Sequence, residues 1–254
     1  MRRWNALLVA MFGCAGSEEP GGSSAADRVA GYIRGDAYSR LVFEVDAVPS
    51  VALRSGVSPA LTQELASLLD KPAGIELVAS GSIESRGAEH AWTEQEVFDL
   101  ESTTDDLAPS STGAIKIHLL LVDGHSAEDD ENGQVLGFAW ANRNVVLFLK
   151  TIEMGCSGLL PRLSAKLCEA AEISVATHEV GHVIGLVDNG LEMVANHRDA
   201  EHGAHDVNDD CVMYWAYEGA GVLDVLGARF NSGQESALGF DDACRADVDK
   251  VRLR

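Results

Sequence analysis

The stretch THEVGHVIGLVDNG, residues 177–190, decides how the chain is interpreted. His178 and His182 are four positions apart, so on a helix both side chains project from one face and can present a ring nitrogen to the same metal ion. Glu179 is rotated from His178 by about 100°, beside that ion, where it can take a proton from a bound water. Catalytic zinc centres use three protein ligands, so another part of the sequence must supply the third.

Two further features follow the helical motif. Gly185 comes three residues after His182, where a glycine in the left-handed conformation can end the helix sharply and turn the chain back toward the metal. The later segment CVMYW, residues 211–215, places Met213 in an apolar turn. Together they indicate a metal site built from one helix and a returning segment.

These motifs resemble the metzincin clan of zinc endopeptidases, whose pattern is HExxHxxGxx followed by His or Asp, with a later methionine turn. The resemblance is close over residues 177–215 and looser over residues 135–149, which look like the clan's substrate-binding strand. It implies a zincin-like fold in which His178 and His182 bind Zn²⁺, Glu179 is the general base and Met213 forms the floor beneath the metal.

The third zinc ligand has several candidates. Asp188 stands at the clan's usual spacing after the glycine, although Asp-Asn-Gly is also a strong turn signal. His205 is the preferred candidate, because imidazole is a common ligand in three-ligand zinc sites and donates its second N–H to an outer partner. His197 and His202 are further alternatives, for which solvent exposure in a charged loop is the favoured interpretation.

The segment from His205 to Met213 is most similar to the motif HCx4CxM of archaemetzincins, whose first histidine is the third ligand. On this alignment residues 188–204 are an insertion, and Asp206 replaces a cysteine that helps to bind a second zinc in that family. The resemblance therefore leaves the second zinc in doubt, and Cys211 becomes available for a disulfide.

The order of hydrophobic patterns predicts an α+β fold, and the resemblance implies that this fold is of zincin (metzincin) type. We expect a mixed, twisted sheet with packed helices in an N-terminal lobe, then the active-site helix and a loop-rich C-terminal lobe. Ser58 is the expected N-cap and Pro59 the first residue of one helix, and Thr93 opens another with a capping box. The expected strands are residues 38–48, 75–79, 114–122 and two pieces of 135–150 joined through 141–144. The expected helices are residues 58–69, residues 93–100 and a helix from near Pro161 that leads into the one carrying the motif.

The charge balance excludes some classes of partner. With 40 acidic and 19 basic residues the formal net charge is −21, which repels phosphate backbones, so no nucleic-acid partner is expected. The acidic residues 123–133 lack the alternating ligands of an EF-hand and are interpreted as a solvated loop. His90 and His118 belong to no pattern and are expected to be structural or exposed. No nucleophile elbow or phosphate-binding glycine loop is present in the sequence.

The N-terminus has the layout of a secretory signal. Arg2 and Arg3 precede an apolar run over residues 4–12, and Gly13-Cys14 resembles a bacterial lipoprotein processing site. We therefore expect a signal peptide over residues 1–14, a flexible tether over 15–26 and one metallopeptidase domain over 27–254. The protein would be a bacterial cell-envelope lipoprotein, attached to the membrane only through lipid on Cys14, or would be secreted after cleavage of an ordinary signal peptide.

The remaining cysteines form an even set of four in a chain expected to reach an oxidising compartment. One or two disulfides are expected, and the preferred pairs are Cys156 with Cys168 and Cys211 with Cys244.

These observations together predict an exported zinc-dependent metallopeptidase that acts on a peptide or protein substrate. The alternative is a catalytically silent lipoprotein that binds a metal or a protein on the same fold. Glu179 argues against the alternative, because a structural zinc needs no base and prefers four protein ligands. The sequence leaves the oligomeric state and the cleavage specificity open.

Overall fold

The computed structural model describes residues 25–108, 113–130, 133–156, 161–219 and 221–252. The predicted signal peptide and most of the predicted tether lie outside the described residues. Helix α1 (Ala25–Ile33) was not predicted from the sequence, and it takes in the last two residues of the expected tether. No helix among the described residues has the length and apolar character needed to cross a membrane.

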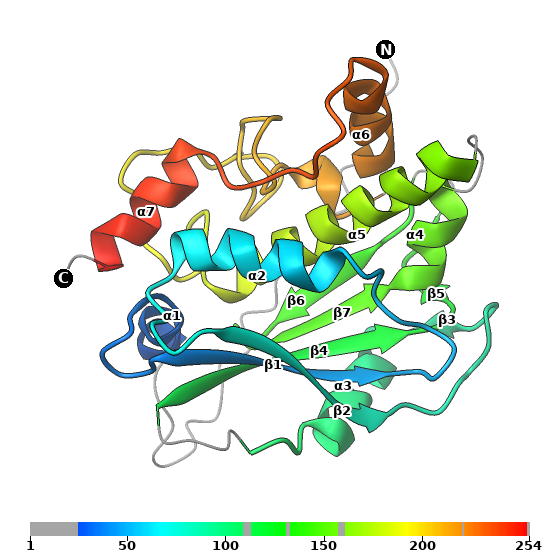
Figure 1. Cartoon of the computed structure of the whole chain (residues 1–254), viewed down its shortest axis with the longest axis horizontal. Helices are drawn as coiled ribbons and strands as arrows, with labels where there is room; N and C mark the ends of the chain where they lie inside the picture. The colour runs from blue at the N-terminus through cyan, green and yellow to red at the C-terminus, as the bar shows by residue number, and fades with distance from the viewer. Residues whose placement is uncertain (1–24, 109–112, 131–132, 157–160, 220, 253–254) are drawn as a thin grey trace.

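A five-stranded sheet forms the centre of the molecule (Figure 1), in the order β2-β1-β4-β7-β6. Neighbouring strands run parallel except at the edge, where β6 runs antiparallel to β7. The mixed sheet predicted from the sequence is therefore confirmed. The strands are β1 (Arg40–Ala47), β2 (Ile75–Ser82), β4 (Ala114–Val122), β6 (Gly137–Trp140) and β7 (Asn144–Phe148). A separate pair, β3 (Ala91–Trp92) and β5 (His125–Ser126), forms a small second sheet.

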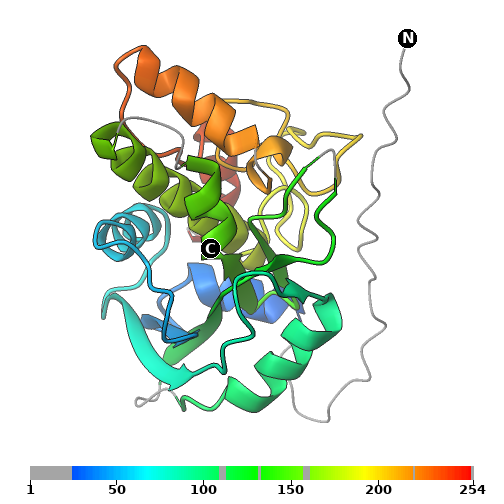
Figure 2. The same cartoon turned by 90° about the vertical axis from the view of Figure 1, so that its right-hand side faces the viewer.

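Helices cover both faces of the large sheet. Helices α2 (Val57–Leu68), α4 (Leu149–Cys156) and α5 (Pro161–Val183) pack on one face, and α3 (Glu94–Thr104) lies on the other, as Figures 1 and 2 show together. The strand at 114–122 was predicted with its observed bounds, and its residues from Ile117 to Val122 are buried between the two layers. This two-sided cover explains why that strand is a continuous apolar run.

The sequence located the start of α3 correctly and that of α2 incorrectly. At α3 the Thr93 side chain accepts from the Glu96 backbone N–H and the Glu96 carboxylate accepts from the Thr93 N–H, which is the predicted capping box. Helix α2, however, begins at Val57, and its N-cap is Gly56 rather than Ser58. The Gly56 N–H donates to the Glu169 carboxylate of α5 at 3.1 Å, so a tertiary contact sets where this helix begins.

The chain between the sheet and the motif also differs from the expectation. Helix α4, which was not predicted, follows β7 directly, and the motif ends a single long helix, α5. The predicted disulfide between Cys156 and Cys168 joins these two helices. Figure 1 shows α5 running across the sheet, where it packs against β6 and β7.

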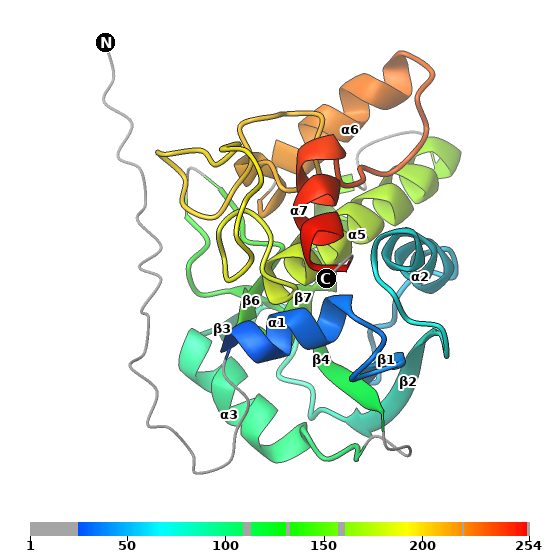
Figure 3. The same cartoon turned by 90° about the vertical axis from the view of Figure 1, so that its left-hand side faces the viewer.

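After α5 the chain forms the predicted loop-rich C-terminal lobe, seen beside α5 in Figure 3. Residues 184–214 contain no helix or extended strand. They are followed by the short helix η1 (Trp215–Tyr217) and by the helices α6 (Gly221–Asn231) and α7 (Asp242–Arg252). The expected disulfide between Cys211 and Cys244 is not present. Both cysteines are buried as free thiols with sulfurs 3.8 Å apart, well beyond the bonded distance of about 2.05 Å.

Candidate metal centre

The last turns of α5 carry the motif residues into the interior. His178, Glu179 and His182 are all buried, and the helix ends where Gly185 adopts a φ of +86°. The Gly185 N–H donates to the His182 carbonyl at 3.1 Å, and a Cβ at position 185 would stand 3.0 Å from the methyl groups of Val29. Both the backbone conformation and the space therefore require the glycine that the sequence singled out.

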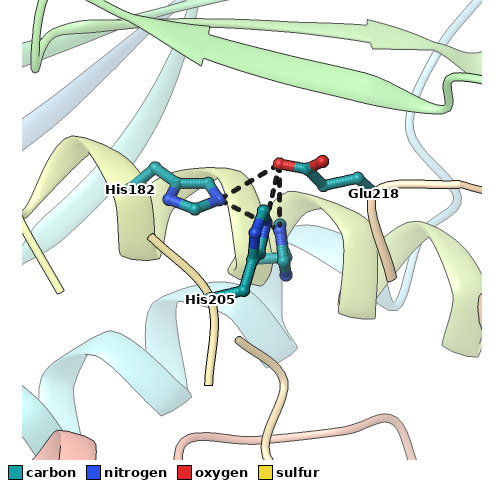
Figure 4. A group of neighbouring side chains, drawn as sticks. His182, His205 and Glu218 are labelled. Atoms are coloured by element: carbon teal, nitrogen blue, oxygen red, sulfur yellow. Dashed lines mark hydrogen bonds and ion pairs between the residues drawn. The ribbon is translucent and has the colours of Figure 1, made fainter. Parts of the chain in front are cut away.

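The structure brings His205 to the two helical histidines. His178, His182 and His205 each contribute a ring nitrogen to one group of potential ligand atoms, which all lie within 4.8 Å of one another. The Nε2 atoms of His178 and His182 are 3.1 Å apart. Figure 4 shows His182 and His205, from helix and loop, facing the same point. Asp188 does not join them: its half-exposed carboxylate pairs with Arg198 at 3.0 Å.

Two of the three imidazoles are oriented by backbone carbonyls. His178 donates from Nδ1 to the Val212 oxygen at 2.6 Å, and His205 donates from Nδ1 to the His202 oxygen at 2.5 Å. An Nδ1–H bound in this way leaves the Nε2 lone pair free for a metal. Burial lowers the pKa of His182 to about 4 despite the raising effect of Glu218, so this ring is neutral at pH 7.

Met213 lies directly against the motif helix. Its sulfur is so close to the backbone of Gly181 that a Cβ on that glycine would stand 2.2 Å from Sδ and 3.0 Å from the Phe240 ring. The Met213 carbonyl accepts from the Asp206 N–H at 2.8 Å, next to His205. The methionine turn, the helix and the His205 loop therefore pack as one unit.

Glu179 is buried beside the histidine group, under the edge strand β6. Neither of its carboxylate oxygens has a hydrogen-bond partner among the described residues. A Cβ at Gly137 would stand 3.3 Å from the Glu179 side chain, so the glycine in β6 leaves room for it. Burial, and secondarily the charge of Glu218, raises the pKa of Glu179 well above its ordinary value.

Glu218 is a member of the site that the sequence did not predict. Its Oε1 lies 2.8 Å from the Nε2 of His205, 3.4 Å from that of His182 and 3.8 Å from that of His178 (Figure 4). Burial alone would raise the pKa of Glu218, but the three imidazoles close to its carboxylate hold that pKa well below its ordinary value. This glutamate belongs to no motif, and only the path of the chain after Met213 brings it to the histidines.

The other histidines have separate partners. His197 is buried between Asp206, at 2.5 Å, and Asp247, at 2.9 Å. His202 stacks on Trp215 with ring centroids 4.2 Å apart. The expectation that both are exposed in a charged loop is therefore wrong for His197, because two carboxylates compensate the burial of its ring. For His118 the expected structural role is confirmed, since it is buried and bonded to Asp46 at 2.7 Å.

A second group of potential ligands lies behind the centre. Asp206, Cys211, Asp241 and Cys244 place their ligand atoms within 4.8 Å of one another. The resemblance to archaemetzincins identified Cys211 and placed Asp206 where that family has a cysteine. Asp241 and Cys244 come from a later part of the chain and belong to no motif that the sequence analysis recognised.

Comparisons with known proteins agree with this geometry at the level of the fold. The sequence matches no family model and no curated protein. Among solved structures, it is similar to an archaemetzincin from Methanopyrus kandleri, with a TM-score of 0.53 and 15% identity over 85% of this chain and 97% of that one. It is also similar to a zinc-dependent peptidase from Methanocorpusculum labreanum, with a TM-score of 0.51 and 15% identity over 81% of this chain and 99% of that one. The predicted zincin-like fold, with its likeness to metzincin peptidases, is therefore confirmed.

Proposed function

We propose that the chain is an exported zinc-dependent metallopeptidase. His178, His182 and His205 hold the metal and Glu179 is the general base. The observation that carries this proposal is the convergence of three imidazoles from two separate segments beside a buried carboxylate whose two oxygens have no partner among the described residues.

The donor set fits zinc. Bonds of about 2.0–2.1 Å to a tetrahedral centre separate neighbouring ligand nitrogens by about 3.3–3.4 Å. The 3.1 Å between the Nε2 atoms of His178 and His182 is close to that value. The backbone acceptors at Nδ1 of His178 and His205 leave Nε2 as the donor atom.

The chemistry divides between the metal and the chain. Bound zinc would polarise the scissile carbonyl and lower the pKa of a bound water. Glu179 would accept the proton of that water and pass it to the leaving amine, a transfer that a carboxylate with a raised pKa performs well near neutral pH. The Val212 and His202 carbonyls keep their imidazoles in orientation during these steps.

The edge of the sheet supports a peptide substrate. Strand β6 is the outermost strand and runs beside the end of α5, with Gly137 against Glu179. An extended peptide can add to such an edge through backbone hydrogen bonds, which would place its carbonyl groups over the histidines. Cleavage within a polypeptide is therefore the reaction that the arrangement favours.

Export is supported by the N-terminal pattern around Cys14 and by the disulfide between Cys156 and Cys168. Disulfides persist in oxidising compartments and are rare in reducing ones. Under this proposal the protein would be anchored to the cell envelope by lipid on Cys14 or released.

The alternative function, a catalytically silent metal-binding protein, is favoured by one observation. Glu218 adds a fourth protein ligand to the three histidines, and structural zinc centres have four. Glu179 opposes it, because a structural centre has no use for a buried carboxylate without partners.

One experiment separates the two functions. The purified protein is incubated with a mixed peptide library with and without a chelator, alongside Glu179→Gln, and zinc content is measured for both proteins. We expect chelator-sensitive cleavage in the wild type that Glu179→Gln loses while it keeps its zinc. Zinc binding without cleavage by either protein would favour the binding function.

A further inference from the structure

We propose that Glu218 is a fourth ligand that closes the metal centre in its resting state, so that activity is reduced until this side chain moves away. The inference rests on the proposed zinc centre and concerns its regulation. The contact that inhibits the metal centre would then come from Glu218, within the folded domain.

The geometry supports a ligand rather than a nearby charge. In a tetrahedral zinc site every pair of ligand atoms is separated by about 3.3–3.4 Å. The Glu218 Oε1 lies 2.8, 3.4 and 3.8 Å from the Nε2 atoms of His205, His182 and His178. These three distances bracket the tetrahedral value, which places the carboxylate oxygen near the fourth corner.

That corner is the one a reacting water needs. The three histidines are buried, whereas 39% of the Glu218 side chain is exposed. Glu218 therefore lies between the histidines and solvent, and Figure 4 shows its carboxylate directed at the histidine group. A water and a substrate carbonyl must approach from this same side, so the carboxylate and the reaction compete for one position.

Opening of the centre would be a movement of the Glu218 side chain, because the backbone of this segment is held by its neighbours. The Glu218 backbone is held at its carbonyl, which accepts from the Leu136 N–H at 3.0 Å, and Gly219 forms a bridge with Val135. These contacts attach the segment to the residues just before β6, the edge proposed to bind substrate. A peptide that adds to β6 would therefore meet the Glu218 segment at its first contact, which couples substrate binding to opening.

A glutamate with another role would be placed differently. A residue that selects a basic side chain of the substrate would direct its carboxylate into the groove, away from the imidazoles. Here one oxygen contacts His205 and is within 4 Å of the other two histidines.

The test compares Glu218→Ala and Glu218→Gln with the wild type and with Glu201→Gln, an exposed acid in the same lobe that is outside the histidine group. Each protein is loaded with Co²⁺ for visible absorption spectra, and its zinc affinity is measured by competition with a chromophoric chelator. Near-ultraviolet circular dichroism of the metal-free proteins checks that each variant is folded.

We expect Glu218→Ala to change the Co²⁺ spectrum, because a water replaces the carboxylate, and to weaken zinc binding by at least the roughly 10–100-fold that loss of an outer-shell partner costs. Its kcat/KM on peptides should rise above that of the wild type. Glu218→Gln should shift in the same direction, and Glu201→Gln should behave as wild type.

Two results would overturn the proposal in distinguishable ways. If all proteins bind zinc and the spectra and affinities of the Glu218 variants match the wild type, Glu218 is not a ligand, and the zinc centre stands without it. If the folded wild type binds neither metal, the proposed function itself fails and this inference fails with it.

Discussion

His178 donates a hydrogen bond from Nδ1 to the carbonyl oxygen of Val212, 2.6 Å away and 34 positions later in the chain. This one bond attaches the motif helix to the methionine turn and directs the other ring nitrogen toward His182 and His205. The geometry of the centre therefore depends on how the C-terminal lobe packs under α5, and the predictions below test the contacts that hold it.

Replacing His205 with alanine should abolish stoichiometric zinc binding and peptidase activity, because it removes one of three converging imidazoles. Asp188→Ala should retain both, since that carboxylate pairs with Arg198 on the surface. Zinc is measured by atomic absorption after dialysis. The opposite pattern, with zinc lost only in Asp188→Ala, would refute the assignment of His205.

Gly181→Ala should destabilise the protein, although alanine favours helices. The new Cβ would stand 2.2 Å from the Met213 sulfur, and overpacking of this kind costs about 1–3 kcal/mol, more than the gain of up to about 1 kcal/mol in helix propensity. The free energy of unfolding is measured with urea.

Gly227→Ala is the matched control, because a Cβ there meets nothing within 4 Å in helix α6. This variant should be unchanged or slightly more stable. If both substitutions change the free energy of unfolding equally, the close contact between Gly181 and Met213 does not make a Cβ at position 181 destabilising.

Removing the disulfide with Cys156→Ser and Cys168→Ser together should lower the free energy of unfolding by about 2–4 kcal/mol. The bond joins α4 to the start of α5 across a separation of 12 residues and so restricts the unfolded chain. Urea unfolding is followed with and without a reductant. The reductant should destabilise the wild type and leave the double variant unchanged; a wild type insensitive to reductant would indicate that the bond is absent in solution.

The stability contributed by His197 should depend on pH. Burial acts to lower the pKa of this imidazole, but its bonds to Asp247 and Asp206 outweigh burial and raise the pKa. The pKa of His197 in the folded protein lies above the unfolded value of about 6.5. Its contribution to the free energy of unfolding is therefore fully present below pH 6.5 and is lost as the pH rises through the folded pKa. The difference in unfolding free energy between wild type and His197→Gln should therefore shrink with rising pH.

Gln63→Ala serves as the control for that measurement, because Gln63 is exposed and its side chain does not titrate. The difference in unfolding free energy between this variant and the wild type should not change with pH. A wild-type advantage over His197→Gln that grows with pH would contradict the charged bridge.

Local rules were enough to identify the helical part of the centre. The spacing of His178 and His182, the position of Glu179 and the need for Gly185 follow from the geometry of a single helix and its end. The strand at 114–122 was equally clear, because burial on both faces leaves a continuous apolar run. These features depend on residues within a few positions of one another, so a sequence pattern can carry them.

The rest of the centre was decided by contacts between distant segments. Spacing alone left His205 and Asp188 as competitors, and the loop between them determines which side chain points inward and which pairs on the surface. Glu218 had no sequence signal, because its place at the histidines depends on the Leu136 hydrogen bond and the packing of the methionine turn. The sequence by itself determined a helix that presents two histidines on one face with a glutamate beside them, the residues proposed as two ligands and a base. Only the tertiary structure decided the third histidine and the carboxylate beside it, because loop closure joins residues that no local periodicity relates.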